Sequence, residues 1–351
     1  MLTDFGCKHC GSNEVVKYGL EGGVQYWWCK KCQRKFADND ALPNMHTPIP
    51  QVSSALNMYY SGMSIDEIRQ HLDQEHNNKP SDSTIYEWIK RFSIEATEAT
   101  NTYKPNVGDV WLADETVIDL DGKKAWFWDI LDTKTRFLLA SQLTYNRTSQ
   151  HAKELLEQAV RRAGKQPRVL ITDKLGAYVE GAEMALGGDT QHIQTKGFIV
   201  QPNTNMIERF HGSLKSRTKV MRGLKTPEGA VMILDGWLVY YNFFRPHEAL
   251  NDKTPAEKAG IKSVLHNWRD VVVLLRGNNI NYDTGELIAT LPDFKRFYHQ
   301  QVDIGTPTRY GLTKKKKRKG VIKARIKRAP VIEVKRMPMI TAISINRRKS
   351  R

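Results

Sequence analysis

The sequence predicts an α/β core that follows a small cysteine-rich unit and an all-helical segment. Three observations lead to this fold class. From about residue 106, three consecutive strand patterns are followed by alternating helix and strand patterns. Apolar residues at helical spacing recur through residues 48–100, and all four cysteines lie within the first 32 residues. At 351 residues, the chain is long enough for two or three domains.

The cysteines form two pairs, Cys7-x-x-Cys10 and Cys29-x-x-Cys32, with 18 residues between the pairs. This spacing fits the template of a structural zinc site, in which four thiolates close the coordination shell of one Zn²⁺ ion. So small a unit buries too little apolar surface to fold alone, and the metal would support its folding. Two disulfides are the alternative, which an intracellular location disfavours. We therefore predict a zinc ribbon over residues 1–40.

Three helical patterns follow a linker at residues 41–50, which holds three prolines. The first covers residues 52–61, and a capping box at Ser64–Glu67 opens the second, which runs to about Leu72. The third begins near residues 81–83. This layout predicts a helix-turn-helix domain over residues 48–100. A plain three-helix packing unit is the alternative, and the long loop at residues 73–80 leaves the geometry open.

The predicted core spans residues 106–260. Strands are expected at about 110–120, 123–132, 136–145, 168–173 and 190–195. Helices are expected at 149–163 and 176–186, and from about residues 205 and 227. Asp121-Gly122, a favoured two-residue turn, should join the first two strands as a hairpin.

Three acidic residues are the candidates for catalysis. Asp114 lies in the strand pattern VWLADETVIDL, Asp173 ends the buried strand pattern RVLITD, and Glu208 opens a basic helix. Such carboxylates can converge where the elements of an α/β sheet meet, and hard divalent cations are their usual partners. Two metal ions would clamp the attacking and leaving oxygens of a phosphoryl transfer. For Glu208, a capping box with Asn205 is the alternative.

Neighbouring polar residues compete with these three. Glu115 is the strongest competitor, although it should point to the opposite face of the strand from Asp114. Asp129 lies on the second strand without an evident partner. His211, one helical turn beyond Glu208, could bond a catalytic water or a phosphate, and a structural role is the alternative.

Together these motifs resemble the DDE transposases of insertion sequences, whose catalytic domain has the ribonuclease H-like fold. The resemblance rests on Asp114-Glu115-Thr116, Thr172-Asp173, Asn205-x-x-Glu208 and the phrase YNFFRPHEAL at residues 241–250, with 34 residues between Asp173 and Glu208. It implies a mixed five-stranded sheet with flanking helices. It also implies that Asp114, Asp173 and Glu208 are the catalytic carboxylates and bind two Mg²⁺ (or Mn²⁺) ions.

The resemblance further implies double-stranded DNA as the partner, both as transposon ends and as target, bound by a homodimer or a larger assembly. The zinc ribbon and helix-turn-helix would recognise the terminal repeats, with the third helix in the major groove. The residues expected to contact DNA are Ser83, Thr84, Tyr86, Arg209, Lys215, Arg217, Lys219 and Arg222. For the cations of the basic helix, a solvated face is the alternative.

Two other functions share some of these features. A DNA-binding regulator built on an inactive core would need no acidic trio, and the intact Asp114, Asp173 and Glu208 argue against it. A ribonuclease H-like nuclease would cut nucleic acid without joining strands, so only its products distinguish it from a transposase.

The last 38 residues differ sharply in charge from the rest of the chain. Residues 314–351 contain 16 Lys or Arg and one acid, so this tail carries +15 of the formal net charge of +16. Such a tail would bind nucleic acid without reading its sequence, and a localisation signal is the alternative for KKKKRK at 314–319. Residues 261–313 form an accessory region to which we assign no role.

The sequence also bears on location. No apolar run approaches the roughly 18–20 residues that a membrane span needs. The first residues, MLTDFGCKHC, lack the pattern of a signal peptide. We therefore expect no membrane partner and an intracellular protein, in the cytoplasm or nucleoid if the host is a prokaryote.

Overall fold

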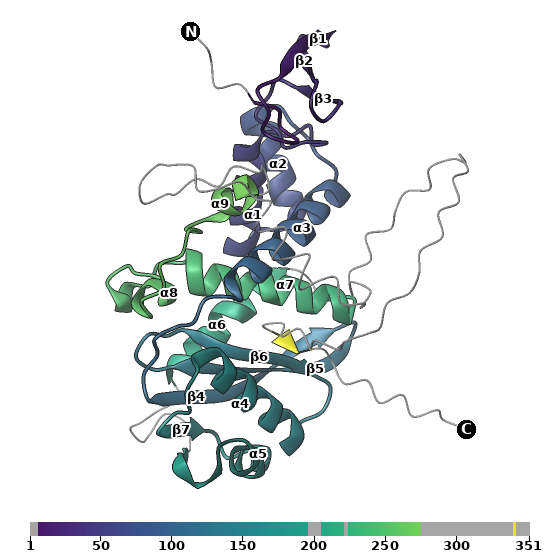
Figure 1. Cartoon of the computed structure of the whole chain (residues 1–351). Coiled ribbons are helices and arrows are strands. Elements are labelled where there is room, and N and C mark those ends of the chain that lie inside the picture. Colours follow the sequence, from purple (N-terminus) through teal and green to yellow (C-terminus); the bar gives the residue numbers. More distant parts are fainter. Residues whose placement is uncertain (1–5, 196–204, 221–223, 275–339, 342–351) are drawn as a thin grey trace, which may run out of the picture. The chain divides into compact units, whose positions relative to one another are not determined.

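The structure of the chain is a computed structural model, which describes residues 6–195, 205–220, 224–274 and 340–341. Figure 1 shows the helices and strands of these residues. Most of the predicted accessory region at 261–313 and nearly all of the basic tail at 314–351 lie outside the described residues, as does Arg222. Within the described ranges, no helix is both long enough and apolar enough to cross a membrane.

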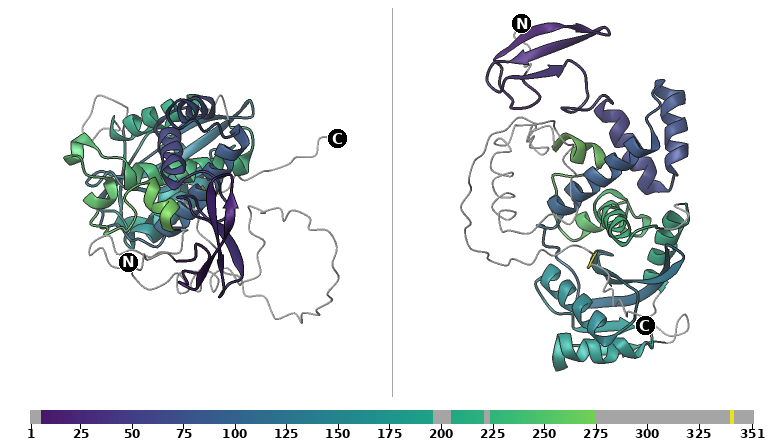
Figure 2. Two further views of the ribbon diagram at one scale, coloured as in Figure 1. Left: turned by 90° about the horizontal axis from the view of Figure 1, so that it is seen from above. Right: turned by 90° about the vertical axis from the view of Figure 1, so that its right-hand side faces the viewer.

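An antiparallel sheet of three strands follows the first cysteine pair and is drawn in purple in Figure 2. Its strands are β1 (Val15–Glu21), β2 (Val24–Cys29) and β3 (Arg34–Ala37), in the order β1-β2-β3. Gly22 and Gly23 join β1 to β2 with φ angles of 59° and 80°, left-handed values that a tight hairpin turn requires. Phe36 packs with Cys7 and Cys29 in a small buried cluster, as expected for a unit too small to have a large core.

Three helices occupy the segment predicted as a helix-turn-helix, namely α1 (Ile49–Ser61), α2 (Ile65–His76) and α3 (Asp82–Thr100). The predicted capping box forms, since the Ser64 side chain accepts a bond from the Glu67 backbone and Glu67 accepts one from the Ser64 backbone. α2 continues past its expected end at Leu72, and the left-handed residue Asn77 ends it. The three helices contact one another and each contributes buried apolar side chains.

The second sheet has the strand order β8-β7-β4-β5-β6-β9. Its strands are β4 (Val110–Leu120), β5 (Lys123–Asp132), β6 (Leu138–Thr144), β7 (Val169–Thr172), β8 (Gln191–Gln194) and the two-residue β9 (Ile340–Thr341). β4, β5 and β6 pair antiparallel, whereas β7, β8 and β9 pair parallel to their neighbours, so the sheet is mixed. The five strands predicted from the sequence form, and β9 adds a short edge strand.

Helices flank both faces of this sheet. The helices of the core are α4 (Ser149–Ala163), α5 (Gly176–Leu186), α6 (Asn205–Val220) and α7 (Pro227–Val239). Successive residues of a strand face opposite sides of the sheet. On β5, Trp128 packs against Tyr178 of α5, whereas Asp129 bonds His211 of α6. Figure 1 shows α4 beside the strands and next to α5. α5 and α6 therefore cover opposite faces of the sheet. The face to which a strand residue points decides which of the two helices its side chain can contact.

The segment after α7 packs against the core and against the first helices. It contains a π-helical turn (Tyr240–Phe244), a 3-10 turn (Glu248–Leu250), α8 (Pro255–Lys258) and α9 (Trp268–Leu274); a further 3-10 turn (Gly187–Asp189) follows α5. Asn242 bonds both backbone groups of Leu138, at 2.9 Å to its N–H and 3.1 Å to its carbonyl. The YNFFRPHEAL segment at residues 241–250 therefore packs onto the start of β6.

Candidate active site

Two of the predicted acids lie side by side because β4 and β7 are parallel neighbours. The pairing matches Val110 with Val169 and Leu112 with Ile171. Two residues further along each strand come Asp114 and Asp173. The same register therefore places both aspartates at one level of the sheet, next to the carboxyl end of β7.

Three carboxylates meet at this level. Asp114, Glu115 and Asp173 each offer one oxygen, and the three oxygens lie within 4.8 Å of one another. That spacing is short enough for one divalent cation to contact all three. From the sequence, Glu115 is expected to face away from Asp114, because adjacent strand residues point to opposite sides of the sheet. The alternation holds, since Asp114 contacts α6 and Glu115 contacts Arg147, but Asp173 stands beyond the end of its strand and lies within reach of both.

Glu115 is held in a largely buried position. Its side chain is 3% exposed, and one oxygen accepts a bond from Arg147 Nη1 at 3.0 Å. The Arg147 guanidinium in turn lies 3.8 Å from the centre of the Trp126 ring. Burial, together with the charge of Asp173, raises the pKa of Glu115.

Asp114 faces the other helix. Asp114 Oδ2 lies 3.6 Å from His211 Nδ1, and the opposite ring nitrogen of His211 lies 2.7 Å from Asp129 Oδ2. Burial raises the pKa of Asp114 to about 7, against the lowering effect of His211. Burial alone would lower the pKa of His211, but Asp129 and Asp114 together outweigh it and raise that pKa. The arrangement thus collects negative charge that a cation would balance.

Glu208 lies in the first turn of α6, three residues before His211. Among the described residues, the carboxylates whose oxygens lie within 4.8 Å of one another are Asp114, Glu115 and Asp173, and Glu208 is not one of them. The structure therefore brings two of the three predicted carboxylates together, and it places the helix of the third beside Asp114 through the His211 contact.

The residues expected to contact DNA divide into exposed and buried ones. Ser83 and Thr84 are exposed in the first turn of α3, with Tyr86 half-buried just after them. On α6, the exposed cations are Arg209, Lys215 and Lys219. Lys215 and Lys219 also line an open pocket beside the β4–β5 hairpin.

Arg217 differs from this expectation. It is 3% exposed, and its guanidinium lies 3.8 Å from the centre of the Tyr59 ring of α1. The reason is its place on the helix, because Arg217 continues the buried stripe of Ile207, Phe210 and Leu214 at spacings of three and four residues. This spacing was readable in the sequence, whereas charge alone suggested exposure.

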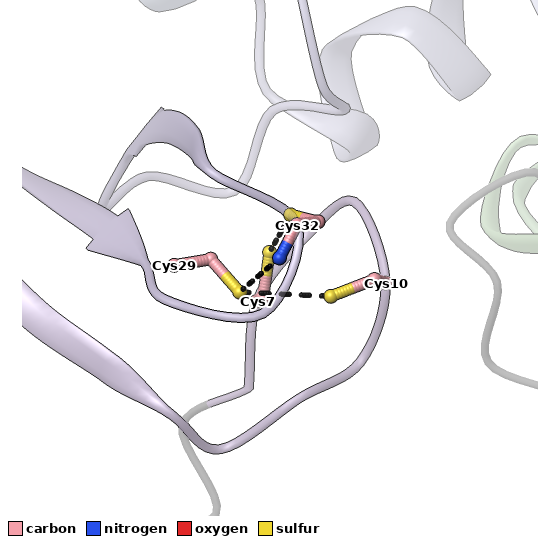
Figure 3. Close-up of side chains that lie close together, drawn as sticks. All are labelled: Cys7, Cys10, Cys29 and Cys32. Carbon is pink, nitrogen blue, oxygen red and sulfur yellow. Dashed lines mark hydrogen bonds between the residues drawn. The ribbon is translucent and has the colours of Figure 1, made fainter.

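A second cluster is formed by the four cysteines, and Figure 3 shows their side chains pointing toward one another. The Sγ atoms of Cys7 and Cys32 lie 3.5 Å apart and those of Cys10 and Cys29 lie 3.6 Å apart. Backbone N–H groups point at two of the sulfurs, from His9 to Cys7 and from Cys32 to Cys29. Although burial opposes it, the Cys32 N–H and the neighbouring thiols lower the pKa of Cys29 to about 7. Four thiols around one point fit a tetrahedral metal ion.

Comparison with known proteins assigns the core to a domain family. Residues 108–247 match a family model described as a DDE domain, that of IS240-type transposases. A search of curated proteins found no match to the chain. Residues 108–247 are therefore a DDE transposase domain, the catalytic domain of a polynucleotidyl transferase.

Solved structures with a similar fold include viral integrases. The catalytic core domain of HTLV-2 integrase is 19% identical, with a TM-score of 0.36, and covers 44% of this chain and 97% of its own. The catalytic core domain of BIV integrase is 18% identical, with a TM-score of 0.34, and covers 43% of this chain and 93% of its own. The mixed sheet with its flanking helices fits the ribonuclease H-like core implied by the resemblance.

Proposed function

We propose that this protein is the transposase of an insertion sequence, which binds the terminal inverted repeats, cuts a strand at each end and joins the freed 3′-hydroxyl to target DNA. The observation that carries the proposal is the convergence of Asp114 and Asp173 beside α6, the helix of Glu208, within the matched DDE domain. We assign the catalytic role to these three residues, and Glu115 adds a further oxygen at the same place.

The proposed reaction has two phosphoryl transfers. Water attacks a phosphodiester at the transposon end, the bond from phosphorus to the 3′-oxygen breaks, and a 3′-hydroxyl and a 5′-phosphate result. That 3′-hydroxyl then attacks a phosphodiester of the target, forming a new bond to phosphorus as the bond to the target's own 3′-oxygen breaks. No bond to the protein forms in either step.

Asp114, Asp173 and Glu208 would hold two Mg²⁺ or Mn²⁺ ions, because hard cations prefer carboxylate oxygens. When bound, such ions supply charge stabilisation to the attacking and leaving oxygens. The protein itself contributes position, because the sheet register fixes the two aspartates and the packing of α6 fixes the helix of Glu208.

The flanking segments would supply DNA binding. We assign one structural Zn²⁺ ion to Cys7, Cys10, Cys29 and Cys32, and a helix-turn-helix role to residues 48–100 with Ser83, Thr84 and Tyr86 reading base edges. On α6, the exposed Arg209, Lys215 and Lys219 would grip the DNA backbone. A homodimer or larger assembly would hold two transposon ends for concerted processing.

The decisive experiment measures cutting and joining on labelled DNA that carries the sequences flanking the gene, with Mg²⁺. The wild type is compared with Glu208→Gln, which keeps the side-chain shape and removes the charge. Glu183→Gln is the matched control, since Glu183 is exposed on α5, outside the three carboxylates. We expect both reactions in the wild type and in Glu183→Gln, and loss of both in Glu208→Gln with DNA binding retained.

Three other outcomes would overturn parts of the proposal. Cutting without joining would favour a nuclease. DNA binding without metal-dependent chemistry in any variant would favour a regulator. Full activity in Glu208→Gln would remove Glu208 from the catalytic carboxylates.

A further inference from the structure

His211 lies between two carboxylates on neighbouring strands. Its Nε2 is 2.7 Å from Asp129 Oδ2, and its Nδ1 is 3.6 Å from Asp114 Oδ2. The two aspartates are direct partners across the antiparallel pairing of β4 and β5. The ring therefore connects a residue of the proposed metal site to an acid one strand further from β7.

Asp129 is an unusual residue for its place in the sheet. Its side chain is 0% exposed, and its second oxygen has no hydrogen-bond partner among the described residues. Burying a carboxylate with one oxygen unbonded is costly, and a well-packed apolar residue is often at least as stable at such a place. Core stability alone therefore does not explain an aspartate at this position. Its hydrogen bond to His211 points instead to a role in holding that ring.

The same bond also fixes a helix. His211 is buried in α6, one turn after Glu208, and contacts to β4 and β5 come from this part of α6. Anchoring the ring to Asp129 holds the rotation of α6 about its axis. Residues three apart lie on one face of a helix, so that rotation also sets the direction of Glu208.

We propose that Asp129 and His211 form one positioning pair, which orients the Asp114 carboxylate and fixes the turn of α6 that carries Glu208. The inference rests on the proposed function, in which Asp114 and Glu208 hold the metal ions. Partners of this kind, one step removed from a metal, typically change metal affinity or activity by 10- to 100-fold when they are replaced. A pair that only stabilised the fold would change neither.

The test compares Asp129→Asn, His211→Gln and the double variant in the full-length, zinc-loaded protein. The readouts are Mn²⁺ binding, followed by the electron spin resonance signal of free Mn²⁺, and the Mn²⁺ concentration for half-maximal DNA cutting. Asp132→Asn is the matched control, because Asp132 is equally buried on β5 but bonds Gly108 and Thr135, away from the carboxylates. Thermal unfolding shows which variants are folded. If Asp129→Asn does not fold, His211→Gln alone provides the test.

We expect each single variant to weaken Mn²⁺ binding and to raise the half-maximal concentration by about tenfold or more. The double variant should be no worse than the worse single one, because the two residues act as a unit. Asp132→Asn should lose thermal stability with unchanged Mn²⁺ dependence.

Two results would overturn the positioning pair: shifts no larger than that of Asp132→Asn, or effects of the two residues that add fully. Failure of the proposed function is a separate result, since a wild type that binds Mn²⁺ without cutting DNA would still report on the pair through the binding measurement.

Discussion

Asp114 and Asp173 stand at the same level of two parallel strands, two residues beyond the pairing of Leu112 with Ile171. Each aspartate follows an apolar run, and the register of the two runs decides whether the acids meet. With Glu115, their oxygens lie within 4.8 Å of one another, so the chain gathers like charges that repel.

A divalent cation should therefore stabilise the fold. At a Mn²⁺ concentration about 100-fold above its dissociation constant, binding to the native state adds about 2.7 kcal/mol, which thermal unfolding detects as a rise in Tm. Asp173→Asn should raise the Tm without Mn²⁺, because one repelling charge is gone, and should abolish most of the rise with Mn²⁺. Asp189→Asn, at an exposed site after α5, is the control. Equal rises in wild type and Asp173→Asn would place the ion elsewhere.

The cysteine cluster predicts a separate, local effect of metal removal. The purified protein should contain one zinc per chain, and Cys29→Ser should lose it, because the buried Cys29 sulfur meets those of the other three cysteines. Limited proteolysis of the zinc-free protein should cut within residues 6–40 and leave a resistant fragment that begins near residue 41. His9→Ala should keep its zinc, since the His9 ring bonds the Lys35 carbonyl instead. Zinc-free wild type that resists cleavage as well as the loaded form would argue against a folding role.

The order of elements in the core was predictable because each element has a clear apolar period. β4 and β5 begin and end at the predicted residues, and the turn at Asp121-Gly122 has the left-handed φ angles of 53° and 72° expected for this pair. The approach of Asp114 to Asp173 was also predictable, because it follows from strand ends that lie next to one another.

Side-chain partners that depend on distant elements were not predictable. Asp129 had no evident partner in the sequence, since the residue that bonds it lies 82 positions later, on α6. Glu115 was not expected beside Asp114 and Asp173, because alternate strand residues face opposite ways. That alternation does not say how far a glutamate side chain can reach. Arg217 was expected to contact DNA because it is charged, although its helical spacing places it on the buried stripe of α6.

The different settings of the cations on α6 predict different effects on DNA binding. Lys215→Ala should weaken binding uniformly across DNA sequences, because Lys215 is exposed. The slope of log affinity against log salt concentration should fall by about 1, as expected for the loss of one phosphate contact. Arg217→Ala should instead lower the free energy of unfolding by about 1–3 kcal/mol, through loss of packing and of its contact with Tyr59. Affinity at two salt concentrations and urea unfolding separate the two. An unchanged stability with a lowered salt dependence in Arg217→Ala would show that Arg217 binds phosphate.

The close approach of α4 and α5 predicts a sharp effect at Gly181. A methyl group there would lie 2.5 Å from Ala152 Cβ and 2.9 Å from the Ser149 carbonyl, and neither neighbour can rotate away. Gly181→Ala should therefore lower the free energy of unfolding by about 1–3 kcal/mol. A methyl group at Gly212 on α6 would have no neighbour within 4 Å among the described residues beyond its own helix backbone and chain neighbours, so Gly212→Ala should be neutral or stabilising by up to about 1 kcal/mol. Equal stability of the two variants would mean that the helices separate easily.

His247 predicts a loss of stability in mild acid. Burial, with the nearby charge of Arg245, lowers the pKa of His247 to about 4, against about 6.5 for a histidine in the unfolded chain. Between these two values, the unfolded chain binds a proton that the native state does not, so the free energy of unfolding falls as the pH drops from about 6.5 toward 4.

We expect this effect to reach about 1 kcal/mol at pH 5, after allowance for the partial exposure of the ring. His247→Asn removes the titrating group, so the difference in urea unfolding between pH 7 and pH 5 should be smaller in this variant than in the wild type. The same substitution at the exposed His266 is the control, because carboxylates also titrate toward this range and contribute to all three proteins. If His247→Asn keeps the wild-type pH dependence, protonation of His247 is not what destabilises the fold, and the contact of its ring with Tyr241 at 4.7 Å must persist in the charged form.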